Sequence, residues 1–172
     1  MLKSGLGTTR TYPVNDAVDI TGEVNLSLVK GEVKLTRTDR GILVTGILRT
    51  DVEVPCSRCL TQFNLPLTLD IEEEYFPTID INSGIAVDVP NEPGCFTVDE
   101  HHILDLTEAV RQYALTAIPI QTLCEPECAG LCPVCGQNLN EKQCGHKVKE
   151  IDERWAKLLE LKTSGKGQEK GR

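Results

Sequence analysis

Hydrophobic and polar residues alternate along most of the first half of the chain. From Val18 to Phe76, aliphatic and β-branched residues recur at every second position, and turn residues at 38–41 and 56–59 interrupt the alternation. Alternating segments between turn signals are typical of antiparallel hairpins. The pattern predicts a β-meander or small barrel-like sheet, with Asp39-Arg40-Gly41 supplying a residue able to adopt a positive φ at one turn.

Two later segments follow a helical period instead. The first begins near Asp105 or Thr107, either of which could cap it, and ends at Pro119. Its apolar face is Leu106, Val110, Tyr113, Ala114 and Ala117. The second segment covers residues 149–162, and its apolar face is Ile151, Trp155, Leu158 and Leu159. These stripes predict two amphipathic helices that dock on the sheet or on neighbouring structure.

The predicted fold class is therefore α+β, with an antiparallel N-terminal β-sheet, C-terminal helices and a zinc-knuckle module. We expect a β-rich domain over 1–98, in which residues 77–98 form an acidic loop. A helix, the zinc-knuckle module and the C-terminal helix follow over 99–162, and a disordered basic tail covers 163–172. Residues 70–110 contain no lysine or arginine. This acidic stretch is either a solvated loop or a surface that docks a basic partner.

Charge and composition narrow the class of protein. The formal net charge is −8, which disfavours direct binding to nucleic acid or to anionic membranes. No apolar run approaches the roughly 20 residues that cross a bilayer, and the first residues lack a secretory pattern, so we expect a cytoplasmic protein without a membrane partner. In a reducing compartment, eight cysteines indicate metal binding or catalysis rather than disulfides.

The spacing of the later cysteines is typical of a zinc site. Zinc prefers four nitrogen or sulfur ligands in a tetrahedron, and a Cys-x-x-Cys turn containing Pro or Gly supplies two of them. Cys132 and Cys135 form such a turn, and Cys144 and His146 follow to complete a set of four. These four residues are candidate ligands of one ion.

Four more cysteines allow a second ion. Cys124 and Cys128 precede the turn, and Cys56 and Cys59 lie far upstream between two predicted strands. The preferred pairing places these four around one zinc ion, which would clip the sheet to the C-terminal module. The alternative is a single zinc ion held by four of the six ligands between Cys124 and His146, with Cys56 and Cys59 reduced or redox-active. Cys95 is interpreted as a small buried hydrophobic residue.

An enzymatic function is the main competing interpretation. Cys56 and Cys59 could form the dithiol of a thiol oxidoreductase, but such a motif belongs at a helix N-terminus after a strand. His101 and His102 are expected to be solvated. Sites whose four ligands all come from the protein are closed, which indicates structural zinc and no catalysis or small-molecule substrate. A non-enzymatic zinc-binding adaptor is a further alternative.

The cysteine motifs carry a family resemblance. Cys-x-Arg-Cys-Leu at 56–60, together with Cys-x-Gly-Leu-Cys-Pro-x-Cys-Gly-x-Asn-Leu-Asn at 128–140, resembles the YceD family of large ribosomal RNA subunit accumulation proteins. Members commonly end the second motif with Cys-x-Cys, where this chain has Cys144-Gly145-His146. The resemblance implies a non-enzymatic role in accumulation or processing of large-subunit ribosomal RNA. The implied partner is ribosomal RNA or a pre-ribosomal particle. As a working hypothesis of our own, an acidic face of the protein meets a basic ribosomal protein, and basic residues such as Arg58 and the tail lie near RNA.

Overall fold

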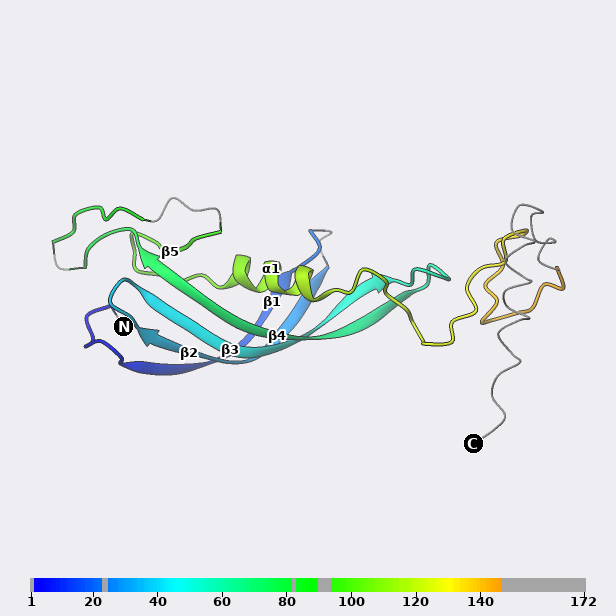
Figure 1. Ribbon diagram of the computed structural model, residues 1–172, viewed down its shortest axis with the longest axis horizontal. Coiled ribbons are helices and arrows are strands. Elements are labelled where there is room, and N and C mark those ends of the chain that lie inside the picture. The colour runs from blue at the N-terminus through cyan, green and yellow to red at the C-terminus, as the bar shows by residue number, and fades with distance from the viewer. Residues whose placement is uncertain (1, 23–24, 82, 90–93, 147–172) are drawn as a thin grey trace, which may run out of the picture.

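The chain forms one long curved sheet with a helix on one face. The computed structural model describes residues 2–22, 25–81, 83–89 and 94–146, so the helix predicted over 149–162 and the tail over 163–172 lie outside the described residues. Figure 1 shows the sheet along the long axis of the molecule, with the cysteine-rich segment at one end. The elements are β1 (Thr9–Asp19), β2 (Leu26–Arg37), β3 (Ile42–Pro55), β4 (Gln62–Pro77), β5 (Phe96–Val98) and α1 (Thr107–Ala117).

The sheet is a meander in which neighbouring strands follow one another along the chain. The strand order is β1-β2-β3-β4-β5, and the first four strands are antiparallel, as the alternation predicts. The last strand, β5, pairs in parallel with Tyr75–Pro77 of β4, so the sheet is mixed. The acidic segment predicted as a loop over 77–98 therefore ends in a strand. Its three residues are too few to show a period of two.

Two details of the predicted sheet need correction. Gly41 does not have a positive φ; instead a Cβ there would collide with the carbonyl oxygen of Tyr75 on β4. The turn therefore requires glycine for close approach of two strands. The sheet also begins earlier than predicted, because β1 starts at Thr9. This edge strand contains Pro13 and is mostly exposed, so its sequence lacks the apolar alternation of a half-buried strand.

The core lies between the sheet and α1. Alternate residues of β2, β3 and β4 point to the same face, and Ala109, Val110 and Ala114 of α1 pack against it. Ala117, predicted on the apolar face of the helix, is exposed, and Ala109 is buried in the core. The largest fully buried side chains of the molecule include Tyr75, Ile20, Leu48, Leu69, Ile71, Val29, Val44, Val52 and Val98.

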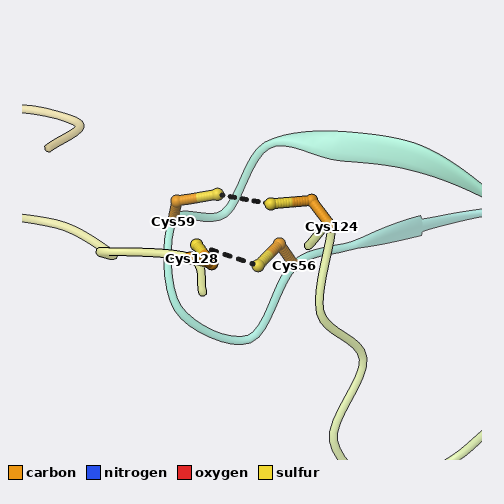
Figure 2. A group of neighbouring side chains, drawn as sticks. All are labelled: Cys56, Cys59, Cys124 and Cys128. Carbon is orange, nitrogen blue, oxygen red and sulfur yellow. Dashed lines mark hydrogen bonds between the residues drawn. The ribbon is translucent and has the colours of Figure 1, made fainter. Parts of the chain in front are cut away.

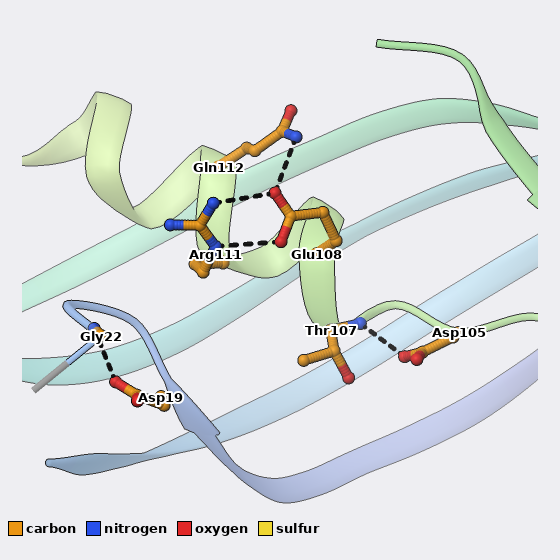
Figure 3. A network of polar contacts seen from close by, with 7 residues as sticks. All are labelled: Asp19, Gly22, Asp105, Thr107, Glu108, Arg111 and Gln112. Atoms are coloured by element: carbon orange, nitrogen blue, oxygen red, sulfur yellow. Dashed lines mark hydrogen bonds and ion pairs between the residues drawn. The ribbon is translucent and has the colours of Figure 1, made fainter. Parts of the chain in front are cut away.

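Polar contacts fix the start of α1 (Figure 3). The N-cap residue is Leu106, and the Asp105 carboxylate accepts a hydrogen bond of 2.8 Å from the Thr107 backbone N–H. Within the first turns, Arg111 forms two hydrogen bonds to the Glu108 carboxylate, at 2.9 and 3.0 Å. Because Arg111 and then Gln112 donate to this carboxylate, the pKa of Glu108 is lowered to about 2.

The cysteine-rich segment follows the helix and packs against the tip of the β3–β4 hairpin. A separate small cluster of buried residues forms there, made of Cys56, Cys59 and Cys128. The predicted division into domains at residue 98 stays a prediction. Among the residues described, no helix is long and apolar enough to cross a membrane.

Candidate metal centres

The fold brings four cysteines from two distant segments together; we call Cys56, Cys59, Cys124 and Cys128 the first quartet. Two of them lie in the turn between β3 and β4, and the other two lie in the segment after α1 (Figure 2). Their four sulfur atoms all lie within 4.8 Å of one another. Cys56, Cys59 and Cys128 are buried, and Cys124 is partly exposed. Packing of the hairpin tip against the later segment therefore creates a compact group of thiols.

The sulfur separations in the first quartet fit a tetrahedral metal ion. The Sγ atoms of Cys56 and Cys128 are 3.8 Å apart, and those of Cys59 and Cys124 are 3.6 Å apart. Four sulfurs at about 2.3 Å from a central zinc ion would be about 3.8 Å from one another. A disulfide would instead require about 2.05 Å. The donor set and its spacing thus fit a four-thiolate zinc site.

The second quartet comprises Cys132, Cys135, Cys144 and His146. Its ligand atoms also lie within 4.8 Å of one another, and the Cys132 Sγ is 3.9 Å from the His146 Nδ1. All four residues come from one continuous stretch of chain. Cys132 is buried, whereas Cys135 and His146 are exposed. The histidine thus lies beside the three cysteines, where it could act as the fourth donor to a metal ion.

The two Cys-x-x-Cys turns have the same backbone geometry. In the first, the Leu60 N–H donates to the Cys56 carbonyl at 2.9 Å, and the Cys56 N–H donates to the Thr61 carbonyl at 3.0 Å. In the second turn, the Gly136 N–H donates to the Cys132 carbonyl at 2.9 Å, and the Cys132 N–H donates to the Gln137 carbonyl at 2.9 Å.

The residue after the second cysteine is left-handed in both turns, with φ of 59° at Leu60 and 72° at Gly136. This conformation is expected of Gly136 but costs a leucine free energy. The repeated geometry means that two unrelated stretches of sequence build the same kind of turn for two thiols.

Backbone hydrogen bonds lower the pKa of one thiol in each turn. The pKa of Cys56 falls from 9.0 to about 6, chiefly through backbone hydrogen bonds from Cys124 and Cys59. The pKa of Cys132 also falls to about 6, through backbone hydrogen bonds from Val134 and Cys135. Donors that point at sulfur stabilise the thiolate, which is the form that binds metal. Each quartet therefore contains a thiol prepared for coordination.

Another thiol in each quartet has a raised pKa. Burial, followed by hydrogen bonding with the sulfur of Cys59, raises the pKa of Cys124 to about 12. The pKa of Cys144 is also raised, because its interactions with Cys132 and its burial outweigh a backbone hydrogen bond from His146. Crowded sulfurs cannot all ionise unless a cation neutralises them. A divalent ion would allow the remaining thiols to ionise.

Polar contacts fasten the hairpin tip to the later segment. The Ser57 N–H donates to the Thr122 carbonyl at 2.8 Å, and the Thr122 hydroxyl donates to the Pro55 carbonyl at 2.6 Å. The Arg58 guanidinium donates to the Cys128 carbonyl at 2.9 Å. The sequence offers no signal for the role of Thr122, since its partners are backbone groups of a distant turn. Arg58, considered above as a residue near RNA, is engaged in holding the first quartet.

The remaining candidates lie outside both quartets. Cys95 is partly exposed, so its interpretation as a buried residue is wrong, and it belongs to neither group of possible metal ligands. His101 and His102 are exposed, as expected for solvated residues, and the His101 Nε2 lies 3.7 Å from a Glu100 carboxylate oxygen. Within the described ranges, neither histidine lies in a group that could hold a metal ion.

Comparison with known proteins identifies relatives that match most of the chain. A family model described as Large ribosomal RNA subunit accumulation protein YceD matches residues 44–162, which include both quartets. An uncharacterized protein of Mycobacterium tuberculosis (strain ATCC 25618 / H37Rv) is 27% identical over 159 residues, covering 87% of this chain and 73% of that protein. No solved structure matches.

Two plant relatives carry the same family name, Large ribosomal RNA subunit accumulation protein YCED homolog 1, chloroplastic. The Arabidopsis thaliana protein is 26% identical over 183 residues, covering 92% of this chain and 54% of the relative. The Zea mays protein is 29% identical over 145 residues, covering 72% of this chain and 50% of the relative. The chain thus spans about half the length of these plant relatives.

Proposed function

We propose a function from one premise: the chain belongs to the YceD family, the large ribosomal RNA subunit accumulation proteins. We infer that it is a non-enzymatic ribosome-biogenesis factor that supports the accumulation and processing of large-subunit ribosomal RNA. The family match over residues 44–162 is the observation that carries this proposal. The location in the cytoplasm stays a prediction.

The two quartets would each hold one structural zinc ion. In the proposed centres all four ligands come from the protein, so the ions have no open coordination position for a substrate. The first ion would join the β3–β4 hairpin to the segment after α1, and the second would organise residues 132–146. When bound, each ion supplies coordination free energy that small apolar clusters cannot provide. Zinc then supports the shape of the module and performs no reaction.

An acidic face of β4 is the proposed docking site for a basic ribosomal protein. Asp70, Glu72 and Glu74 alternate along the strand and therefore share one face of the sheet. Asp70 and Glu72 are exposed, and Glu74 accepts a hydrogen bond of 2.6 Å from the Thr38 hydroxyl. Together with the net charge of −8, this face favours a cationic protein over RNA as the direct contact.

Affinity purification at low salt tests this proposal. We expect the tagged protein to enrich large-subunit ribosomal RNA together with ribosomal proteins. The double variant Asp70→Lys/Glu72→Lys should lose most of this material, because two attractive charges become repulsive. Asp39→Lys/Glu100→Lys makes the same change of net charge at other exposed positions and should retain it. Recovery of neither ribosomal RNA nor ribosomal protein by the unaltered chain would refute the proposed function.

A thiol oxidoreductase is the competing function, and the lowered pKa of Cys56 is the observation in its favour. That cysteine is 0% exposed and lies 3.8 Å from the sulfur of Cys128. A thiol that is buried and bound to metal would not react with disulfide substrates. Disulfide reductase activity in the metal-loaded protein would favour the enzyme, whereas activity limited to chelator-treated samples would favour a structural site.

A further inference from the structure

The asparagines of the sequence Gln-Asn-Leu-Asn at 137–140 connect the two quartets without belonging to either. The Asn140 Nδ2 donates a hydrogen bond of 3.2 Å to the Cys128 Sγ of the first quartet. Its Oδ1 accepts a hydrogen bond of 2.7 Å from the Ala129 backbone N–H. An amide oxygen can only accept and an amide nitrogen can only donate, so the bond from Ala129 orients the NH₂ group toward the sulfur.

Asn138 supports this arrangement and extends it to a second thiol. Its Oδ1 accepts hydrogen bonds of 3.0 Å from both the backbone N–H and the Nδ2 of Asn140. Its Nδ2 donates to the Thr61 hydroxyl at 3.3 Å, and that hydroxyl oxygen is 3.4 Å from the Cys59 Sγ. Two polar connections therefore run from residues 138–140 to two sulfurs of the first quartet.

The second quartet closes the loop that carries these asparagines. Cys135 precedes the loop and Cys144 follows it, and both belong to the second quartet. Inside the loop, the Leu139 N–H donates to the Gly130 carbonyl at 2.9 Å. A metal ion held by the second quartet would fix both ends of the loop and hold Asn140 close to Cys128.

We propose that Asn140 is a positioning residue of the first centre and that it couples the two centres, so that metal in the second quartet strengthens metal binding by the first. This inference rests on the proposed metal-binding function of both quartets. A hydrogen bond from an N–H group stabilises the charge of a coordinating thiolate. Without metal in the second quartet, the loop must lose conformational entropy before Asn140 can donate. By linkage, metal in the first quartet strengthens binding by the second to the same degree.

Metal affinity of the first centre tests the positioning role. Competition of the full chain with a chromophoric chelator for Zn²⁺ should show an affinity about tenfold lower in Asn140→Ala, the size of effect typical of residues that orient a ligand. Asn140→Asp keeps an oxygen for the Ala129 N–H but places a carboxylate beside the thiolate, so its affinity should fall at least as far. Gln143→Ala removes a neighbouring exposed amide that forms no hydrogen bond among the described residues and should have no effect.

Cobalt substitution gives a readout that a general loss of stability would not change. Co²⁺ bound by four thiolates and Co²⁺ bound by three thiolates and an imidazole have different absorption spectra, so the two centres are read separately. The sulfur-to-cobalt band of the first centre should shift in Asn140→Ala, because one thiolate loses its hydrogen-bond donor. An unchanged band and unchanged affinity in both Asn140 variants would overturn the proposal.

A double-mutant cycle tests the coupling. Cys135→Ser removes a ligand of the second quartet and should lower the affinity of the first centre by about the same tenfold factor. Adding Asn140→Ala to this variant should lower it little further, whereas additive losses would overturn the coupling. An unaltered chain that binds no metal would refute the proposed metal centres themselves. Two ions in the unaltered chain with no effect of Asn140 would refute this inference alone.

Discussion

The two quartets offer similar ligands but are assembled differently. In the first quartet, Cys56 and Cys128 are 0% and 2% exposed and come from segments on either side of α1. The second quartet is local in sequence, and its Cys135 and His146 are exposed. A local quartet can organise its own loop, whereas the first quartet exists only where two distant parts of the chain meet. The proposed ion of the first quartet therefore joins tertiary structure, and that of the second shapes one segment.

The sheet and the hairpin tip differ in the kind of side chains that they bury, and this difference supports the proposed metal ion at the tip. The sheet and α1 share a core of buried aliphatic residues that includes Leu48, Leu69 and Ile71. Among the described residues, the buried members of the cluster at the hairpin tip are three cysteines, and the partly buried Phe63, Leu123 and Leu131 pack against them. Apolar burial stabilises the sheet, whereas the cluster at the hairpin tip buries far fewer apolar side chains. We infer that coordination replaces hydrophobic packing there.

Removing the metal should produce the largest difference between the cysteine-rich segment and the sheet. Each structural zinc ion contributes on the order of 10 kcal/mol in small zinc modules. A strong chelator should therefore make residues 118–146 sensitive to protease while the far-ultraviolet signal of the strands persists. Limited proteolysis with mass spectrometry locates the cuts. Identical cleavage with and without chelator would contradict the structural role of the ions.

A substitution in the core should destabilise the sheet and leave the metal centres intact. Leu48→Ala empties a fully buried position between β2 and β4 and should lower the free energy of unfolding by about 2 to 5 kcal/mol. Metal content at low temperature should not change. Ile47→Ala is the matched control, because that neighbour is 58% exposed. Thermal denaturation measures the stability of both variants. Loss of metal from folded Leu48→Ala would show that metal binding depends on the packing of the sheet.

Acid should release metal, and the slope of metal affinity against pH should change near pH 6. In the metal-free chain the pKa of Cys56 is lowered from 9.0 to about 6, so its thiolate stabilises the fold fully above pH 9, and this contribution is lost as pH falls through 6. Cys124, with its pKa raised to about 12, is protonated at pH 7 and must lose that proton to bind metal.

For each proton that metal displaces, affinity falls tenfold, or by about 1.4 kcal/mol, for every unit by which the pH is lowered. Below pH 6 the proton of Cys56 adds to that of Cys124, so affinity should fall more steeply there than above. Chelator competition at a series of pH values measures the slope. A slope that stays constant through pH 6 would contradict the assigned pKa of Cys56.

The left-handed residues of the two turns should give the smallest effects. A Cβ at Gly136 would touch nothing within 4 Å, so Gly136→Ala should cost only the conformational penalty, about 1 kcal/mol. Leu60→Gly relieves the same penalty but increases the entropy of the unfolded chain, so it should stabilise by less than about 1 kcal/mol. Each substitution lies in the turn of one quartet, so the zinc affinity of that centre measures its effect. Destabilisation by Leu60→Gly would show that the 65% exposed leucine has contacts that outweigh its strain.

The sequence predicts most of the sheet because its strands are half-buried. Alternation reveals β2, β3 and β4, whereas β1 is an exposed edge and β5 has only three residues. Helical spacing likewise predicts α1, although it selects Ala117 where the core contains Ala109. A periodic pattern identifies elements that bury one face and misses those that bury little.

The candidate centres divide in the same way. Spacing alone groups the second quartet, since its residues are close in sequence. The first quartet can be proposed only by counting leftover cysteines, because no local pattern shows that the 56–59 turn meets residues 124–128. The contacts of Asn140 and Thr122 are still less accessible, since each depends on backbone groups placed by the tertiary fold.

Metal content is the measurement that tests the central claim most directly. The account predicts two zinc ions per chain, and one in Cys56→Ser, whose first quartet lacks a ligand. Cys95→Ser removes a thiol that belongs to neither quartet and should retain two ions. Elemental analysis of the three purified proteins, each normalised to protein concentration, decides the matter. No zinc in the unaltered chain, or two ions remaining in Cys56→Ser, would contradict the claim that sulfur-bound metal joins the hairpin to the later segment.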